Sequence, residues 1–181
     1  LIVPLGISYY TFSSVGYLLD IYWRKKKYEK SFLNLFVSMS FFPQMVQGPI
    51  AHYPKLIEQV KNLKGFEYQR FCMALQLMLW GYFKKLVIAD RIAVFVNQVF
   101  NHIGYYRGLV FVLALMASAV QLYADFSGCM DIVEGVAELF GITLDKNFDV
   151  PFSSKTTAEF WRRWHITLGA WFKDYVFFPM S

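Results

Sequence analysis

Long apolar stretches separated by short polar connections make up most of this sequence. Four of them approach the length of about 20 residues that a helix needs to cross the hydrocarbon core of a membrane. They cover residues 1–23, 32–50, 71–89 and 108–126. Two further stretches, residues 92–100 and 132–144, are too short or too acidic to count as spans. The pattern predicts an all-α fold and a polytopic integral membrane protein.

Each of the four stretches is interrupted by residues that are unfavourable at membrane depth. Asp20, Gln44, Lys84 and Asp125 are examples, one from each stretch. Such groups are costly there unless they face protein or a wet cavity. The interruptions therefore favour a protein with an interior site over a simple bundle of anchoring helices.

Composition supports the membrane interpretation. The chain is 56% hydrophobic and only 17% charged, whereas an ordinary soluble domain is about 25% charged. It holds 12 Tyr and 5 Trp, the residues that gather at membrane–water interfaces. Basic residues contribute to a net charge of +5 and cluster at positions 24–30, directly after an apolar stretch. Anionic lipid is therefore an expected partner, and nucleic acid is not.

The two ends of the sequence look cut. The chain begins in an apolar stretch that has no basic region before it, and it ends directly after an aromatic run. The first feature is not that of a signal peptide. We therefore interpret residues 1–181 as a single membrane-embedded core fragment that is truncated at both ends.

The distribution of basic residues leaves the topology open. If every stretch crosses the membrane, residues 24–30 and 84–107 lie on one side. Lys55, Lys61, Lys64 and Arg70 then lie opposite, and the positive-inside rule weakly favours the first side as cytoplasmic. If residues 32–50 are re-entrant, the assignment reverses.

The most informative run is residues 153–179, SSKTTAEFWRRWHITLGAWFKDYVFFP. Thr156 followed by Glu159 is a capping-box pattern and predicts a helix start. On one continuous helix, 3- and 4-residue spacing creates a shared face. That face comprises Ala158, Trp161, His165, Leu168 and Phe172.

His165 is the candidate catalytic residue. A neutral imidazole is the usual acceptor of a proton from a hydroxyl near pH 7, and an apolar setting keeps it neutral. A hydrogen-bonded structural histidine is the more common finding among aromatic residues, so both interpretations stay open. His52 and His102 fall in connecting segments and are expected to face solvent.

Two other runs place polar groups at membrane depth. In residues 121–131, QLYADFSGCMD, Asp125 is either a site residue or a structural partner for an arginine such as Arg162. In residues 41–49, FFPQMVQGP, prolines bound a break. That break lines a cavity, makes a re-entrant turn or only kinks a helix.

Signatures of several other chemistries are missing from the sequence. It contains no phosphate-binding glycine loop, no G-x-S-x-G nucleophile motif, and no H-E-x-x-H or Cys/His metal set. We therefore predict no metal site and no bound cofactor. Cys72 and Cys129 lie in apolar segments and are expected to be buried, reduced thiols.

These runs, in this order, resemble the membrane-bound O-acyltransferase (MBOAT) family, and within it the bacterial AlgI/DltB-like branch. The likeness is closer to the AlgI-like, acetyl-transferring members. The matching stretches are PLGISYYTF (4–12), FFPQMVQGPI (41–50), GYFKKLVIAD (81–90), YADFSGCMDI (123–132) and NFDVPFSSKTTAEFWRRWHITLGAWFKDYVFFP (147–179).

The resemblance implies a multi-helix acyltransferase of the bacterial cytoplasmic membrane with a central tunnel. An acetyl thioester or an acyl carrier protein would supply the acyl group as co-substrate. The acceptor would be a hydroxyl of an extracytoplasmic glycopolymer, such as an alginate-like exopolymer or peptidoglycan. A periplasmic or extracellular acyltransferase is a further expected partner.

The resemblance also assigns roles to individual residues. His165 matches the first of two histidines associated with activity in the family. Trp161, Arg162 and Trp164 would shape the tunnel wall, and Asp125 and Gln44 would be weaker candidates for its polar lining. No second histidine follows His165, so the chain on its own is expected to be inactive.

Two alternatives stay open. The acyl group could be D-alanine, passed from a carrier protein to teichoic acid. The chain could instead belong to a membrane transporter without catalytic chemistry, because broken helices with polar residues at mid-membrane also suit transporters.

Overall fold

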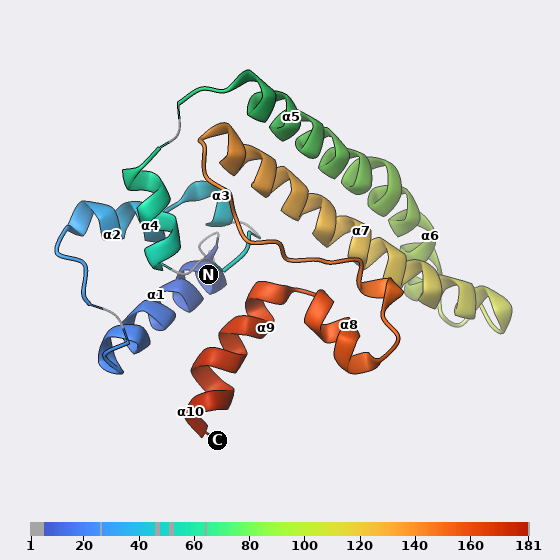
Figure 1. The fold of residues 1–181 in the computed structure, drawn as a ribbon. Helices are drawn as coiled ribbons and strands as arrows, with labels where there is room; N and C mark the ends of the chain where they lie inside the picture. Colours follow the sequence, from blue (N-terminus) through green and yellow to red (C-terminus); the bar gives the residue numbers. More distant parts are fainter. Residues whose placement is uncertain (1–5, 26, 46–47, 51–52, 64, 181) are drawn as a thin grey trace.

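Figure 1 shows the computed structural model, which describes residues 6–25, 27–45, 48–50, 53–63 and 65–180. The described secondary structure is helical apart from one antiparallel bridge between Phe148 and Trp164, which confirms the all-α prediction. The elements in chain order are α1 (Ile7–Tyr22), α2 (Phe32–Met39), α3 (Phe42–Met45), α4 (Tyr53–Lys61), α5 (Tyr68–Tyr82), the π-helix η1 (Phe83–Ala89), α6 (Asp90–Asn101), α7 (Leu109–Leu139), the 3₁₀-helix η2 (Pro151–Ser153), α8 (Thr157–Arg163), α9 (Ile166–Phe172), the π-helix η3 (Lys173–Phe177) and α10 (Phe178–Met180).

Two long antiparallel helices dominate the structure (Figure 1). The first runs through α5, η1 and α6 over Tyr68–Asn101, and the second is α7 over Leu109–Leu139. Both are long and apolar enough to cross a membrane, and only 11% of each apolar window is buried inside the protein. A core helix of a soluble protein would be mostly buried, so these helices offer their apolar surface to lipid or to further protein.

Glycines bring the two long helices into close contact. A Cβ added at Gly81 would lie 2.6 Å from the carbonyl oxygen of Gly128, and one added at Gly128 would lie 2.8 Å from that of Gly81. Further along, a Cβ at Gly135 would lie 2.8 Å from the carbonyl oxygen of Ala74. Small residues at such crossings are what membrane helices use to pack backbone against backbone.

The predicted spans at 71–89 and 108–126 lie within these longer helices. Helix α6 continues directly from the first of them, so residues 92–100 are not a separate element. The second extends to Leu139 and takes in part of the acidic stretch 132–144. Charged residues made these segments look interrupted in the sequence, but the helices continue through them.

The stretch 32–50 is not a single long helix. It divides into α2, α3 and the residues 48–50, so the predicted proline-bounded break is present. Val46 and Gln47, inside that break, lie outside the described residues. Because proline restricts both its own φ and the conformation of the residue before it, Pro43 and Pro49 do not favour a continuous helix here.

The basic loop 24–31 and helix α4 lie on the same side of the molecule. The Lys61 ammonium is 3.4 Å from a Glu29 carboxylate oxygen, and the backbone N–H of Glu29 donates to the Tyr17 hydroxyl. The hydrogen bond that Glu29 accepts from the backbone N–H of Ser31 is the main cause that lowers the pKa of Glu29 to about 2. The topology that placed residues 24–30 and Lys61 on opposite sides is therefore wrong, and the alternative with a re-entrant 32–50 segment fits.

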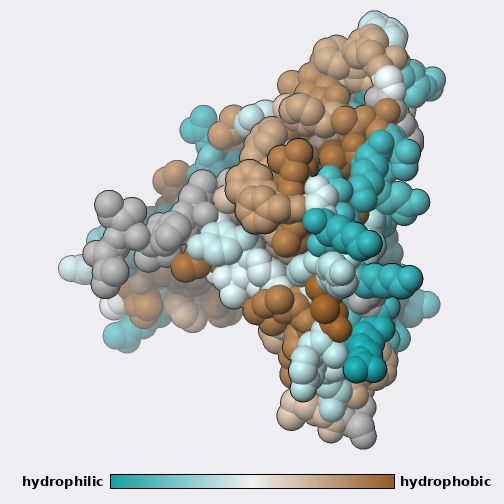
Figure 2. All heavy atoms as spheres, turned by 90° about the vertical axis from the view of Figure 1, so that its left-hand side faces the viewer, coloured by the Kyte–Doolittle hydropathy of each residue, from teal (hydrophilic) through white to brown (hydrophobic). Residues whose placement is uncertain are grey.

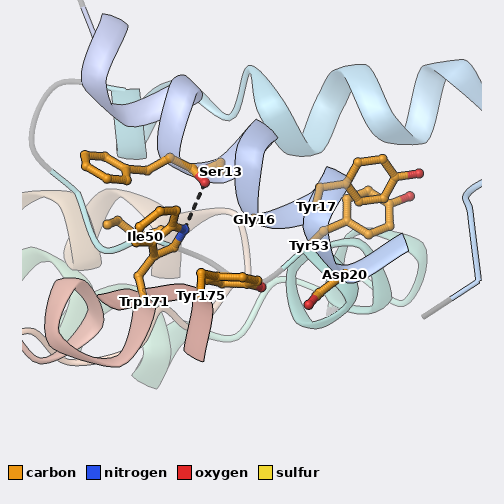
Figure 3. A pocket seen from close by; sticks show the side chains of 9 residues that line it. Ser13, Gly16, Tyr17, Asp20, Ile50, Tyr53, Trp171 and Tyr175 are labelled. Atoms are coloured by element: carbon orange, nitrogen blue, oxygen red, sulfur yellow. Dashed lines mark hydrogen bonds between the residues drawn. The ribbon is translucent and has the colours of Figure 1, made fainter. Parts of the chain in front are cut away.

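Helix α1 packs against α9 and η3 (Figure 3). The Trp171 indole N–H donates to the carbonyl oxygen of Phe12 at 3.0 Å. Gly16 permits this approach, since a Cβ there would lie 3.1 Å from the Trp171 nitrogen. A polar cavity of about 10 Å³ remains beside Asp20 and Tyr53, which is enough for one water molecule.

Much of the described surface is apolar. Figure 2 views the left-hand side of Figure 1 and shows hydrophobic atoms over the upper and central part of that face, with hydrophilic atoms gathered along its right-hand edge. Large exposed side chains on α7 include Leu109, Met116 and Leu122. Exposed apolar area on this scale is expected of a protein embedded in a membrane or in a larger helical assembly.

Candidate active site

His165 lies at a break between two short helices. Helix α8 ends at Arg163, Trp164 is extended, and His165 adopts a left-handed conformation with φ 47° and ψ 55° before α9 begins. A non-glycine residue in this region costs about 1–3 kcal/mol, and such residues cluster at functional sites. The prediction of one continuous helix with a face running from Ala158 to Phe172 is therefore wrong.

A backbone pairing explains the break. The N–H of Asp149 donates to the carbonyl oxygen of Arg163 at 3.0 Å, and the N–H of Ile166 donates to that of Asn147 at 3.0 Å. These bonds pair the backbone around His165 with the segment 147–149. The helical hydrogen-bond pattern of α8 therefore ends there. The sequence periodicity of α8 and α9 contains no sign of this partner.

The predicted start of α8 is confirmed. The Thr156 hydroxyl accepts from the backbone N–H of Glu159, and the Glu159 carboxylate accepts from the backbone N–H of Lys155. The same carboxylate pairs with Arg163 at 2.7 Å. The hydrogen bond from Lys155 first, and then the Arg163 charge, lower the pKa of Glu159.

Asn147 is a buried centre of hydrogen bonds beside His165. It is 1% exposed, and its Oδ1 accepts from the backbone N–H and the hydroxyl of Thr167 at 3.2 and 2.6 Å. Its Nδ2 donates to the Met130 sulfur. The Thr167 hydroxyl also accepts from the backbone N–H of Ile50, so this network ties α9 to the segment that follows α3.

The His165 ring itself is half-buried. Its Nδ1 lies 3.3 Å from Asn147 Oδ1, and the ring packs edge-on against Phe126 of α7 with centroids 4.9 Å apart. Burial lowers the pKa of His165, so the imidazole is neutral at pH 7, as its apolar surroundings predicted. Nε2 makes no hydrogen bond to any residue that the structure describes.

The predicted tunnel-wall residues divide into two groups. Trp164 joins an aromatic cluster that reaches His165 through Phe126. The rings of that cluster are Tyr123, Phe126, Phe148, Phe152, Phe160 and Trp164. Trp161 and Arg162 are exposed on α8, and Trp161 reaches the cluster only through its contact with Phe160.

Asp125 pairs with a lysine of the neighbouring long helix. Its carboxylate lies 2.5 Å from the ammonium of Lys85, while the adjacent Lys84 lies 2.6 Å from Asp131 and 3.3 Å from the Ser127 hydroxyl. The arginine partner considered for Asp125 is therefore wrong. Both lysines belong to η1, a π-helix of the kind that often marks functional sites.

A polar cavity of about 290 Å³ lies between the long helices and the segment after α7. It shares Tyr123 and Phe148 with the aromatic cluster. Its charged and hydroxyl lining comprises Lys84, Ser127, Asp131, Glu134, Lys146 and Asp149. A cavity lined by charges at the depth of an apolar helix is the interior feature that the interrupted stretches predicted.

None of the predicted site residues, His165 included, belongs to the lining of this cavity. Gln44 is buried on α3, and its Nε2 has no hydrogen-bond partner among the described residues. His102 is exposed at the end of α6, as expected, whereas His52 lies outside the described residues.

Cys72 and Cys129 are free thiols and only partly buried. The described part of the chain contains no group of three or more metal-ligating side chains.

Sequence patterns alone gave no role to Asn147 or to the lysine pair. The available signals were modest: Asn147 opens the longest stretch of family likeness, and Lys84 with Lys85 interrupts an apolar segment. Ionisable residues inside a candidate span are site candidates by default, and this applies to Lys84 and Lys85.

Comparison with known proteins shows the family of the chain. Residues 24–181 match the family model for MBOAT, the membrane-bound O-acyltransferase family. The chain is 34% identical over its whole length to a peptidoglycan O-acetyltransferase of Helicobacter pylori, and 32% identical over 99% of its length to a probable alginate O-acetylase AlgI of Pseudomonas putida. It is 31% identical over 98% of its length to a teichoic acid D-alanyltransferase of Bacillus subtilis.

The chain spans 39%, 37% and 45% of the lengths of these three relatives. The matched stretch nevertheless includes both long helices, the lysine pair and the turn at His165. Because the family model covers residues 24–181 and the likeness to individual members runs through the whole sequence, this chain belongs to the membrane-bound O-acyltransferase family.

Proposed function

We propose that the protein carrying this chain is a multi-pass enzyme of the cytoplasmic membrane that transfers an acetyl group to a hydroxyl of an extracytoplasmic polysaccharide. The observation that carries the proposal is the state of His165: a neutral, half-buried imidazole in a strained turn, with Nε2 not hydrogen-bonded to any described residue. This is the arrangement that a general base for a hydroxyl requires.

In the proposed reaction, the acceptor hydroxyl donates its proton to Nε2 of His165 as its oxygen attacks the carbonyl carbon of an acetyl thioester. The tetrahedral intermediate then collapses, the C–S bond breaks, and the imidazolium returns the proton to the thiolate. An ester and a free thiol are the products. General-base catalysis of this kind contributes about 10²–10⁴-fold to the rate.

The nature of the acceptor is proposed from the relatives together with the site. Proteins similar to this chain are named for peptidoglycan and for alginate, which are both polysaccharides. The polar cavity beside Tyr123 and Phe148 combines carboxylates, lysines and aromatic rings. Such a lining suits a polyhydroxylated ligand, because it offers hydrogen-bond partners and flat apolar faces together.

D-alanyl transfer to teichoic acid is the second candidate. The teichoic acid D-alanyltransferase of Bacillus subtilis matches 98% of the chain at nearly the same identity as the acetylating relatives. The chemistry at His165 would be unchanged, since only the acyl group and its carrier differ.

The test is to measure base-labile acetate and base-labile D-alanine in purified envelope glycans. Cells would carry the full-length protein, its His165→Ala variant, its His102→Ala variant, or none. His102 is the matched control, because it is an exposed histidine on a turn and its Nδ1 contacts only the local carbonyl of Gln98.

We expect acetate with the wild type and with His102→Ala, and a loss of about 100-fold or more with His165→Ala at an equal amount of protein in the membrane. Release of D-alanine in place of acetate would select the second candidate. Equal ester content in all four strains would contradict acyl transfer to these glycans.

A further inference from the structure

The best-organised hydrogen-bond network near the site surrounds Asn147, which the proposed reaction does not itself use. We infer that Asn147 is a positioning residue that holds His165 in the neutral tautomer with the proton on Nδ1, so that Nε2 is the atom that accepts the proton of the acceptor hydroxyl. This inference rests on the proposed function and adds to it the residue that fixes which ring nitrogen acts as the base.

The orientation of the Asn147 amide follows from its partners. The backbone N–H of Thr167 can only donate, so the amide atom 3.2 Å away must be the oxygen. The other end of the amide faces the Met130 sulfur, which accepts. Both contacts require the same orientation, and an exchange of oxygen and nitrogen would place two donors against each other at Thr167.

The tautomer of His165 follows from that orientation. Nδ1 lies 3.3 Å from the Asn147 oxygen, and an amide oxygen only accepts, so Nδ1 carries the proton. A neutral imidazole has one N–H, which leaves a lone pair on Nε2. The contact is longer than the usual 2.9–3.0 Å, as is common for catalytic hydrogen bonds before substrate binds.

The Asn147 amide is uncharged, and this affects the protonation of His165. A carboxylate at position 147 would accept the same hydrogen bonds but would favour the imidazolium and make His165 protonated at higher pH. Burial is the cause that shifts the pKa of His165 in this structure. The charged side chains on the elements around the ring are Lys146 and Asp149 on the segment after α7, Glu159, Arg162 and Arg163 on α8, and Asp125, Asp131, Glu134 and Glu138 on α7.

Four of those charges are already paired. Arg163 binds Glu159 within α8, while Asp125 binds Lys85 and Asp131 binds Lys84 on the neighbouring long helix. The direct hydrogen-bond partner of the imidazole is therefore an uncharged group, and this keeps the ring available as a base at neutral pH.

Asn147 also fixes the backbone at the same place. Its carbonyl oxygen accepts from the N–H of Ile166, directly after the left-handed residue. Asn147 thus holds the His165 ring through its side chain and the turn through its backbone. A variant that only loses activity would therefore not distinguish a wrong ring orientation from a local folding defect. The test needs a readout that follows protonation.

The experiment uses membrane vesicles from cells carrying the full-length protein, with radiolabelled acetyl-coenzyme A as the donor probe. Base-labile label in the vesicle glycans is measured across pH 5 to 9. The variants are Asn147→Asp, Asn147→Ala, His165→Ala and the control Asn62→Asp. The control makes the same amide-to-carboxylate change at an exposed asparagine after α4, whose side chain donates to the local carbonyl of Glu58.

We expect Asn147→Asp to move the acidic limb of the pH–rate profile upward by about one unit or more, since the new carboxylate stabilises the imidazolium. Asn147→Ala should reduce transfer at pH 8 about tenfold or more, because the tautomer is no longer fixed. Asn62→Asp should keep both the rate and the profile of the wild type.

The inference is overturned if His165→Ala is inactive while Asn147→Asp has the wild-type profile, because a purely structural asparagine would tolerate the isosteric change. If His165→Ala transfers acetate as well as the wild type, the proposed function fails, and the two failures are therefore distinct. Should Asn147→Asp not accumulate in membranes, ¹⁵N NMR of histidine-labelled wild type decides, with the His165 signals assigned by their loss in His165→Gln. A protonated Nε2 in the neutral ring would overturn the inference.

Discussion

At the scale of single residues, His165 should make stability depend on pH. Burial lowers its pKa in the folded protein, whereas the unfolded chain has a value of about 6.5. The unfolded state therefore binds the proton more readily. The contribution of His165 to stability is fully present above about pH 6.5 and is lost as the pH falls through the lower folded pKa.

We therefore expect the melting temperature of the purified full-length protein in detergent to fall as the pH is lowered from 7 towards 5. His165→Gln should remove part of that fall, and His102→Gln should leave it unchanged because His102 is exposed. A pH dependence in His165→Gln identical to that of the wild type would contradict the buried, neutral imidazole.

The surroundings of His165 were predictable, but its conformation was not. A histidine among aromatic residues indicates a ring kept neutral, and the structure confirms that environment. The left-handed turn arises from backbone bonds between residues 147–149 and 163–166. Helical periodicity reports only neighbours within about four positions, so it could not reveal a partner 18 residues away.

At the scale of elements, the start of α8 provides a measurable local contribution. Removing the Thr156 hydroxyl leaves the N–H of Glu159 without its cap, and such a loss costs about 1 kcal/mol. We expect Thr156→Ala to lower the stability of the full-length protein by about this amount in chemical unfolding. Thr157→Ala is the matched control, because its hydroxyl makes no hydrogen bond among the described residues, and equal effects of the two changes would contradict the capping role.

The ion pair between the two long helices should have a larger effect. Lys84 and Asp131 are only 14% and 17% exposed and lie 2.6 Å apart. Lys84→Met would leave a buried carboxylate without its partner, at a cost of about 3–5 kcal/mol. The double variant Lys84→Met with Asp131→Leu should recover most of this loss in the same unfolding measurement, and additive losses would show that the two side chains do not depend on each other.

The existence of the long helices was predictable from hydropathy, but their lengths were not. Asp90 and Arg91 made residues 71–89 and 92–100 look like separate segments. In the structure, Asp90 pairs with Lys85 at 3.1 Å, so the charge is satisfied without ending the helix. Hydropathy counts a charged residue as a cost, whereas a paired charge in a helix facing another helix can be accommodated.

At the scale of the whole molecule, composition predicted the all-α class and the membrane setting, and contacts between distant segments decided the arrangement. The contact of α1 with α9 depends on Gly16 and on an indole hydrogen bond across 159 positions. The contact of the 24–31 loop with α4 depends on Glu29, which pairs with Lys61 and is hydrogen-bonded to Tyr53. Neither contact has a local sequence signal, which explains why the alternating topology looked plausible.

The corrected arrangement leads to a definite topology. The loop 24–31 and α4 share one side, and the first long helix begins at Tyr68, a few residues after α4 ends. The turn at 102–108 is then at the opposite end of the hairpin. Among the described basic residues, Arg24, Lys25, Lys27, Lys30, Lys55 and Lys61 lie on the first side and Arg107 lies in the turn, so the positive-inside rule now favours the first side as cytoplasmic.

Cysteine labelling of the full-length protein in spheroplasts tests this topology. With Cys72, Cys129 and every cysteine outside this chain replaced by alanine, single cysteines would be placed at the exposed positions Lys27, Asn62 and Tyr105. A membrane-impermeant maleimide should label Tyr105→Cys in intact spheroplasts, and Lys27→Cys and Asn62→Cys only after lysis. The cysteine-free protein controls for background. Labelling of Lys27→Cys and Asn62→Cys from opposite sides would contradict the shared side, because the ion pair between Lys61 and Glu29 requires both segments to lie on one face of the membrane.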